Sequence, residues 1–246
     1  PRSATSPVAY LNVVVNNATG STLTAARGTT FTTTVDSVSY NYIVKDATTI
    51  SPVDGVYTFS NLEVYEGTLI SNKYTVDTTD ADQRFLIKNN LADTTTLLVT
   101  VQNSSGDTTT STYTLATDLA DITSSSKVYY LEGAEDQQYE VKFGDGVLGA
   151  ALSTGNIVTL SYIVTNAEES NGASSFSLSG NIGGFSNVTI TTATNSANGA
   201  QPETPDSIRF NAPRQYASQN RTVTPKDYQS KVKQIYTNAK SVSVWG

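Results

Sequence analysis

The chain of 246 residues contains no cysteine, no histidine and no methionine. Without cysteine it can form no disulfides and no thiolate metal site, so the fold must depend on packing alone. Without histidine and cysteine the usual nucleophile–base pairs and zinc sites cannot be built. An enzyme would need paired carboxylates, lysine, tyrosine or a carboxylate-bound cation. We therefore predict a protein that is not an enzyme, with no catalytic residues, no metal and no cofactor.

Charged residues make up only 15% of the chain and hydrophobic residues 37%, both low for an ordinary cytosolic enzyme. No apolar run approaches the 18 residues of a membrane span, and no signal peptide is evident, so we expect no membrane partner. The chain begins at Pro1 rather than at methionine, and 241–246 has the pattern of a strand that has just begun. We expect a processed chain or a fragment, with sequence missing on both sides.

Charge is unevenly distributed along the sequence. Residues 203–246 hold seven Lys/Arg against three Asp/Glu, a net of +4, and residues 1–202 hold eight against nineteen, a net of -11. Such asymmetry favours an interface between unlike surfaces, although solvated surfaces also drift in charge without purpose. An acidic body repels phosphates and no basic stripe interleaves with aromatics, so we expect no nucleic-acid partner.

The first two hundred residues are rich in Thr, Val and Tyr, which pack well on a pleated surface. Short alternating segments separated by turn signals predict strands, and their regular spacing favours a sandwich or a barrel. The predicted strands are 9–15, 29–35, 39–44, 56–59, 62–65, 73–76, 84–87, 96–101, 111–115, 127–131, 138–143, 156–164 and 187–192. The fold class is therefore mainly β with a small α part.

Between these strands lie a polar break and an acidic turn. The break, 117–125, has room for a single helical turn around 118–120. The acidic turn, 132–136, is expected to join 127–131 and 138–143 as a hairpin. Residues 165–200 are rich in Ser, Asn, Gly and Ala, and we expect one strand there.

Two segments after Gln201 carry helix start signals. Thr204 and Thr224 suit the N-cap position, each is followed by proline, and Asp227 completes a variant of the capping box. Pro213 is expected to stop the first helix. The second helix is predicted over 225–238, with one apolar face formed by Tyr228, Val232, Ile235 and Ala239.

Three other patterns suggest chemistry but have simpler interpretations. The alternating acids Asp77, Asp80 and Asp82 resemble a calcium loop, yet the spacing of helix-flanked calcium sites is not met, which favours a solvated turn. The glycine-rich segment 143–149 lacks the Lys-Ser/Thr of a phosphate-binding loop, and no helix pattern follows it. Asp145-Gly146 is better explained as a tight turn, with Gly144, Gly146 and Gly149 supplying positive φ or close backbone approach.

Two motifs resemble those of the baseplate-J-like family, whose members form wedges in contractile phage tails and related injection machines. The first is a Phe-Gly-Asp-Gly turn followed by two glycines and a strand with a tyrosine, here Phe143, Gly144, Asp145, Gly146, Gly149, Gly155 and Tyr162. The second lies about sixty residues later and comprises Glu203, Thr204, Arg209, Pro213, Arg221, Thr224, Asp227 and Tyr228. A weaker likeness to the entry hairpin of the family covers 20–31.

The resemblance implies two domains, a β-sandwich or barrel-like domain at 61–172 inserted into a β-rich domain, 1–60 and 173–246, that ends in short helices. It implies a structural role for the motif residues, with Arg209 and Arg221 available to bind carbonyls or carboxylates and lock the helices to a sheet. It also implies a virion protein of the tail baseplate, assembled in the host cytoplasm. The expected partners are a second copy, as a homodimer or higher oligomer, and other wedge proteins.

The net charge of 203–246 places Lys226, Lys231, Lys233 and Lys240 near an expected interface. Two rival functions remain open from the sequence. Thr/Ser/Asn-rich β modules with many tyrosines also serve as carbohydrate-binding or adhesin modules, and paired carboxylates can form a glycosidase.

Overall fold

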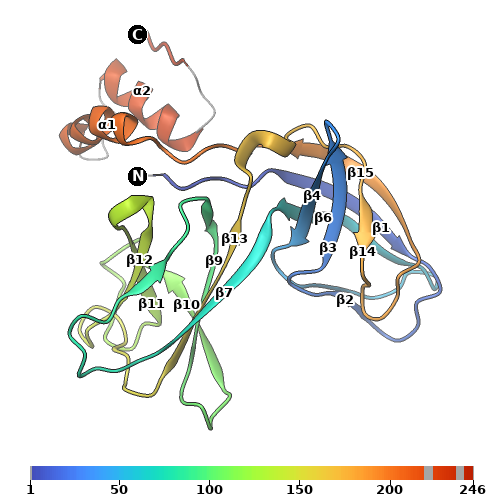
Figure 1. Ribbon diagram of the computed structural model, residues 1–246, viewed down its shortest axis with the longest axis horizontal. Helices are drawn as coiled ribbons and strands as arrows, with labels where there is room; N and C mark the ends of the chain where they lie inside the picture. Colours follow the sequence, from blue (N-terminus) through green and yellow to red (C-terminus); the bar gives the residue numbers. More distant parts are fainter. Residues whose placement is uncertain (1, 219–223, 237–240, 246) are drawn as a thin grey trace.

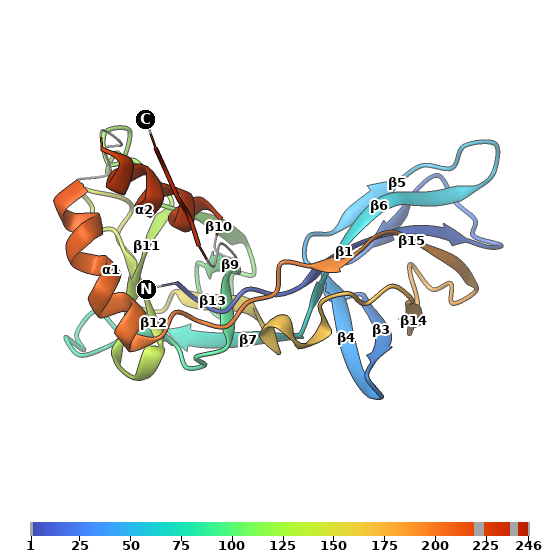
Figure 2. The same cartoon turned by 90° about the horizontal axis from the view of Figure 1, so that it is seen from above.

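The computed structural model describes residues 2–218, 224–236 and 241–245 (Figure 1). Strands make up 47% of it and helices 10%, which confirms a mainly β fold with a small α part. Two large sheets dominate: one is a half-barrel, and the other is a nearly closed barrel. The helices α1 and α2 lie outside both sheets, next to the barrel (Figures 1 and 2).

The half-barrel sheet has six strands in the order β14-β3-β4-β6-β1-β15, with antiparallel neighbours throughout. Its strands are β14 (Ser177–Ser179), β3 (Thr30–Val35), β4 (Val38–Val44), β6 (Tyr57–Glu66), β1 (Val8–Val15) and β15 (Val188–Ala197). A two-stranded sheet of β2 (Leu23–Ala25) and β5 (Thr48–Ile50) lies beside it. The concave face buries one apolar core, to which β1 contributes Ala9, Leu11, Val13 and Val15 at every second position.

The barrel sheet has seven strands in the order β7-β13-β9-β10-β11-β12-β8. These strands are β7 (Thr68–Thr75), β13 (Ile157–Val164), β9 (Ala92–Gln102), β10 (Thr110–Leu115), β11 (Val128–Gly133), β12 (Tyr139–Phe143) and β8 (Phe85–Ile87). All neighbours are antiparallel except β10 and β11, which run parallel. A second apolar core fills this barrel and shares no residue with the first.

The single strand β6 replaces the two predicted strands 56–59 and 62–65. Asn61 has φ 52°, and the pairing register with β1 shifts between Leu11 and Val13. A bulge of this kind inserts one residue, so the buried positions change from Tyr57 and Phe59 to Leu62 and Val64 without breaking the strand. The interrupted alternation that suggested two strands is therefore the signature of the bulge.

Several other sequence expectations are corrected. Residues 118–120 form a bend and a turn rather than a helical turn, and 241–245 are not a strand. The region 165–200 holds two strands, β14 and β15, and a short 3₁₀ segment, η2 (Ala167–Ser170). The predicted hairpin across 132–136 is confirmed as β11 and β12, with the 3₁₀ turn η1 (Glu135–Gln137) at its tip.

The chain passes from the first sheet to the second at Gly67 and returns at 164–166. The predicted boundary at residue 61 falls inside β6, which belongs entirely to the first sheet. Gly67 has φ 129°, and a Cβ built there would lie 2.3 Å from the carbonyl oxygen of Val164. The outgoing and returning segments therefore touch at a point that only glycine can occupy.

Buried polar groups surround this crossing. The Glu66 carboxylate is fully buried and accepts hydrogen bonds from the Thr165 hydroxyl, 2.5 Å, and from Asn166 N–H and Nδ2, 2.8 and 2.7 Å. The equally buried Asp93 accepts from Ser6 N–H at 2.8 Å and from Thr95. Because each carboxylate has several donors, the cost of burying its charge is offset locally.

Arg27, in the loop before β3, is a third polar side chain at this crossing, which we call the junction. Its guanidinium donates to the carbonyl of Lys45 in the first sheet's loops and to those of Thr96, 3.0 Å, and Ser161, 3.3 Å, in the barrel. Burial lowers the pKa of Arg27, with Asp46 acting in the opposite direction. One side chain therefore binds backbone from a loop after β4 and from two strands of the barrel.

The substitution Gly67→Ala is expected to destabilise the protein by more than the roughly 1–3 kcal/mol of backbone strain alone, because its methyl group meets the Val164 carbonyl. Gly155→Ala is the matched control, since Gly155 also has positive φ, 91°, but faces open space. Urea unfolding of both variants checks this, and equal losses would contradict it.

Candidate assembly interface

Glu203 anchors the helical segment to the start of the chain. Its side chain is 9% exposed and accepts from the backbone N–H of Arg2 at 3.2 Å and from the Ser207 hydroxyl at 2.9 Å. The Glu203 N–H in turn donates to the Arg2 carbonyl at 3.0 Å. This motif residue therefore joins the N-terminal segment to the first turn of α1 (Pro205–Ser218).

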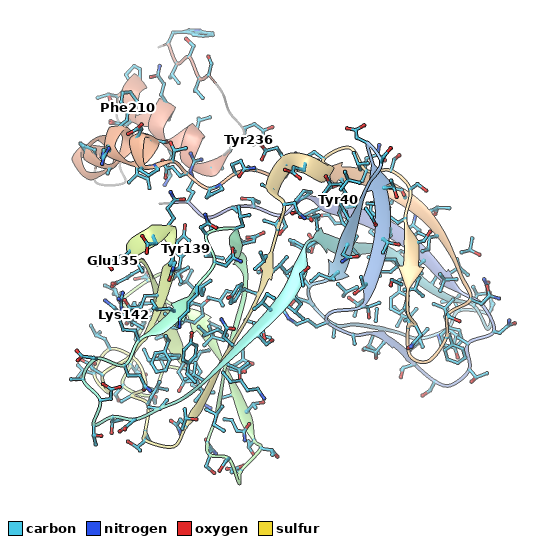
Figure 3. All side chains as sticks on the ribbon, viewed as in Figure 1. Tyr40, Glu135, Tyr139, Lys142, Phe210 and Tyr236 are labelled. Atoms are coloured by element: carbon cyan, nitrogen blue, oxygen red, sulfur yellow. The ribbon has the colours of Figure 1, made fainter. Side chains whose placement is uncertain are left out.

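Glu203 also lies near one end of the barrel. Burial, and secondarily the nearby charge of Glu203, raise the pKa of Tyr139 to about 12. Tyr139 begins β12, next to the η1 turn, and Figure 3 shows it at the end of the barrel that is nearest the helical segment. Ser3 and Thr94 join their hydroxyls at 2.9 Å, so the N-terminal segment is bound to the barrel as well.

Both predicted helix caps are confirmed. The Ser207 N–H donates to the Thr204 hydroxyl at 3.3 Å. Thr224 and Asp227 form a reciprocal capping box at the start of α2 (Pro225–Ile235). The bounds differ from the prediction, because α1 continues through Pro213 and α2 ends at Ile235, with Tyr236 as its C-cap. Proline removes one hydrogen bond and crowds the preceding turn, which weakens a helix but does not always end it.

The apolar face of α2 is exposed. Of the four predicted residues, Tyr228, Val232 and Ile235 are described, and Ile235 is 75% exposed. Phe210 of α1, Tyr236 and Trp245 are exposed as well, and Figure 3 shows Phe210 and Tyr236 on the helical segment. None of these residues belongs to either core among the described residues. Exposed apolar side chains gathered on one segment are typical of a binding surface.

The structure describes only some of the basic residues predicted to lie at an interface. The side chains of Lys226 and Lys233, and all of Arg221, Lys240 and Ala239, lie outside the described residues. Lys231 is described and is partly buried. Arg209 does bind a carboxylate, but that of Asp206 on its own helix, 3.2 Å away, where both side chains are largely exposed. In the described part of the chain it does not lock the helix to a sheet.

The Phe-Gly-Asp-Gly segment forms a rigid turn at the far end of β12. A Cβ on Gly144 would lie 2.3 Å from the backbone of Gly149, and Gly146 and Gly149 have φ of 87° and 94°. The Asp145 carboxylate accepts from the N–H groups of Val147, 2.9 Å, and Leu148, 3.0 Å, and these bonds lower its pKa. The predicted turn, and the two roles given to its glycines, are confirmed.

The other residues of this motif support the barrel. Phe143 contacts Phe85 and Tyr113 edge to face, with ring centroids 5.4 Å apart in both pairs. Tyr162 is 2% exposed, its hydroxyl accepts from Asn72 Nδ2 at 3.0 Å, and burial raises its pKa. Gly155 has φ 91° in the turn before β13. These contacts pack and shape the barrel.

The acidic loop after β7 is a pair of side-chain-capped turns. Asp77 accepts from Thr79 N–H and hydroxyl, which lowers its pKa, and Asp80 accepts from Asp82 N–H. Within the described residues, no three acidic side chains are grouped so that they could hold a metal ion. The same loop and β12 line a shallow cavity of about 390 Å³ at the gap between β7 and β8.

The structure places the two motifs at different ends of the barrel. Glu203 lies near Tyr139, the first residue of β12, whereas Gly144 follows its last residue. Sequence reasoning missed the junction residues Arg27, Glu66 and Asp93. Glu66-Gly67 between two alternating segments was the available signal, because a glycine inside a strand pattern marks a close backbone approach.

No protein-family model matches this chain, and no match to a curated protein is found. Among the described residues, none of the helices has the length and apolar character needed to cross a membrane.

Substituting Thr224→Ala is expected to destabilise α2 by about 1 kcal/mol, because the N–H of Asp227 loses its capping acceptor. Amide hydrogen exchange within α2 should then be roughly fivefold faster, since exchange follows local opening. Gln229→Ala, which leaves the cap intact and introduces a good helix former, should not accelerate exchange. Equal rates in the Thr224 variant and the unmodified chain would contradict the assigned cap.

Proposed function

We propose that this chain is a non-enzymatic structural component of a contractile phage tail, part of a baseplate wedge that assembles in the host cytoplasm and remains in the virion. Its work is mechanical: it helps form the baseplate ring and transmits the conformational change of the baseplate toward sheath contraction. The proposal starts from the two motifs that resemble the baseplate-J-like family, and within it the wedge proteins of T-even-type phages.

The observation that carries the proposal is the role of the motif residues. Gly144, Gly149 and Asp145 shape a turn, Thr204 and Thr224 cap helices, and Glu203 ties two segments together. Each of these side chains or glycines fixes backbone geometry. A motif that specifies shape is what an assembly component requires, because its contacts must be presented at fixed positions.

The proposed architecture is two domains. The half-barrel sheet and the helical segment form the outer domain, and residues 67–165 form the inserted barrel. The two separate apolar cores support this division, since each sheet buries its own concave face.

The proposed partners are further copies of this chain and other wedge proteins. The α2 helix supports this, because it combines an exposed apolar face with a basic sequence beside an acidic body. Apolar contact supplies affinity at such an interface, and unlike charges supply orientation.

Antibodies raised against the chain are expected to label the baseplate end of contractile tails in electron micrographs of phage particles that encode it. Pre-immune serum is the control. Label confined to the tail fibres or to the capsid would contradict the proposed location.

The chain alone is expected to form dimers or larger oligomers in sedimentation equilibrium, with weaker association at high salt because screening reduces attraction between unlike charges. Association that strengthens with salt would show that the contact is not electrostatically assisted, contrary to the proposed role of the lysines.

A further inference from the structure

One long edge of the half-barrel sheet lacks a neighbouring strand along part of its length. The edge strand β15 pairs with β1 on one side only. Near its C-terminal end the other side is covered, because Ser196 N–H donates to the Ala173 carbonyl at 2.9 Å and the Ser196 carbonyl accepts from Gly172 N–H at 2.7 Å. Among the described residues, no backbone bond covers that side at 188–191. We call residues 188–191 the free edge.

The free edge presents the backbone groups of two residues to solvent. Asn16 N–H donates to the Asn187 carbonyl at 2.9 Å, so these residues form a hydrogen-bonded pair between β1 and β15. Hydrogen-bonded and non-hydrogen-bonded pairs alternate in antiparallel sheets, and the register with β1 is regular over 188–191. The N–H and C=O groups of Val188 and Ile190 therefore point away from β1. Their side chains pack against the apolar core, which holds these groups in position for an added strand.

The other edges of the two large sheets have features that discourage pairing with another chain. The strands β14 and β8 have three residues each, and β7 carries the exposed Lys73. Short strands and lysines are among the means by which natural sheets protect their edges. In contrast, β15 has ten residues and contains neither proline nor a charged residue. Its bulge lies between Thr192 and Thr194, outside the free edge. The free edge is therefore a long-strand edge without such protection.

The distribution of charge favours a second copy of the chain as the partner. The chain has a net charge of -7, so two copies repel each other over most approaches. Residues 170–202 contain no charged residue, and neither do residues 3–26, which include the adjacent strand β1. Two copies that meet at the free edge therefore bring neutral strands together and oppose no like charges. A basic partner finds no carboxylate on these strands to bind.

Antiparallel pairing makes this edge complementary to itself. A two-fold axis at Thr189 pairs Val188 of each copy with Ile190 of the other, and each of these pairs exchanges two backbone hydrogen bonds. All the outward-pointing groups of the free edge are then satisfied. The exposed Thr189 side chains of the two copies lie directly opposite each other, with Cβ atoms about 5 Å apart, as expected for a non-hydrogen-bonded pair.

We propose that two copies of this chain associate through their free edges, β15 against β15, across a two-fold axis at Thr189. The contact is isologous, because each copy uses the same surface, and it joins two six-stranded half-barrels into one continuous sheet. Figures 1 and 2 show that β15 starts at the side of the half-barrel remote from the barrel and the helices. The inference rests on the proposed function in expecting self-assembly, and it names a surface separate from α2.

The absence of cysteine allows this geometry to be tested by cross-linking. Thr189→Cys places one thiol of each copy at the axis, and oxidation with copper phenanthroline should give a disulfide-linked dimer on non-reducing gels. Thr191→Cys is the matched control, since Thr191 is exposed on the same face of β15. Its two copies would lie about 13 Å apart along the strand direction. We expect the Thr189 variant to cross-link about tenfold faster, because only its thiols are within disulfide distance.

A lysine variant tests the contact without oxidation. Thr189→Lys opposes like charges across the axis and should weaken association about tenfold in sedimentation equilibrium. Thr58→Lys is the matched control, because Thr58 is exposed and pairs with Val14 from the opposite side of β1 to Thr189. It makes the same change in net charge within the sheet rather than at its edge and should leave association unchanged. Far-ultraviolet circular dichroism of each variant confirms that it has folded.

The outcomes distinguish the edge contact from the broader function. If the Thr191 variant cross-links as fast as the Thr189 variant or faster, or if the two lysine variants associate equally well, the edge contact is overturned. An unmodified chain that stays monomeric also overturns it. In each of these cases labelling of the baseplate by antibody still decides the proposed function independently.

Discussion

The contact between Gly67 and the Val164 carbonyl determines how the rest of the molecule is arranged. At this point the chain leaves the half-barrel and returns to it, and the absence of a side chain lets the two segments lie against each other. The buried carboxylates of Glu66 and Asp93 and the guanidinium of Arg27 then satisfy backbone and side-chain donors and acceptors from both sheets. Polar groups buried in this way specify one geometry, because any other arrangement leaves a charge without partners. The junction is thus held by buried polar contacts as well as by the two backbone crossings.

The helical segment depends on a different set of bonds. None of its described residues belongs to either core, and it is held at its start by Glu203, which binds the N-terminal segment at Arg2 and the first turn of α1 at Ser207. That segment in turn binds the barrel through Ser3 and the junction through Ser6. A single extended stretch, residues 2–6, therefore connects the helices, the barrel and the junction, although it contains no regular secondary structure beyond an isolated bridge at Thr5.

Local patterns in the sequence predicted local structure well. Alternation located most strands, and the cap residues Thr204 and Thr224 and the turn at Asp145-Gly146 were identified because each interacts with residues only a few positions away. The parts that sequence could not predict depend on distant partners. Glu66 finds its donors a hundred residues later, Asp93 binds Ser6, and Arg27 binds Thr96 and Ser161. The exposure of Val147 and Leu148 also escaped prediction, because their pattern is that of any apolar pair after a turn.

Thr68, the first residue of β7, pairs with Val164, the last residue of β13, so the chain enters and leaves the barrel within one strand spacing. Residues 68–164 therefore form a loop of the half-barrel whose two ends are fixed next to each other. The entropic cost of closing such a loop grows only with the logarithm of its length. The barrel can therefore lengthen, shrink or exchange its surface loops during evolution while the half-barrel keeps its register, and new binding specificities can be acquired without refolding the sheet that carries them.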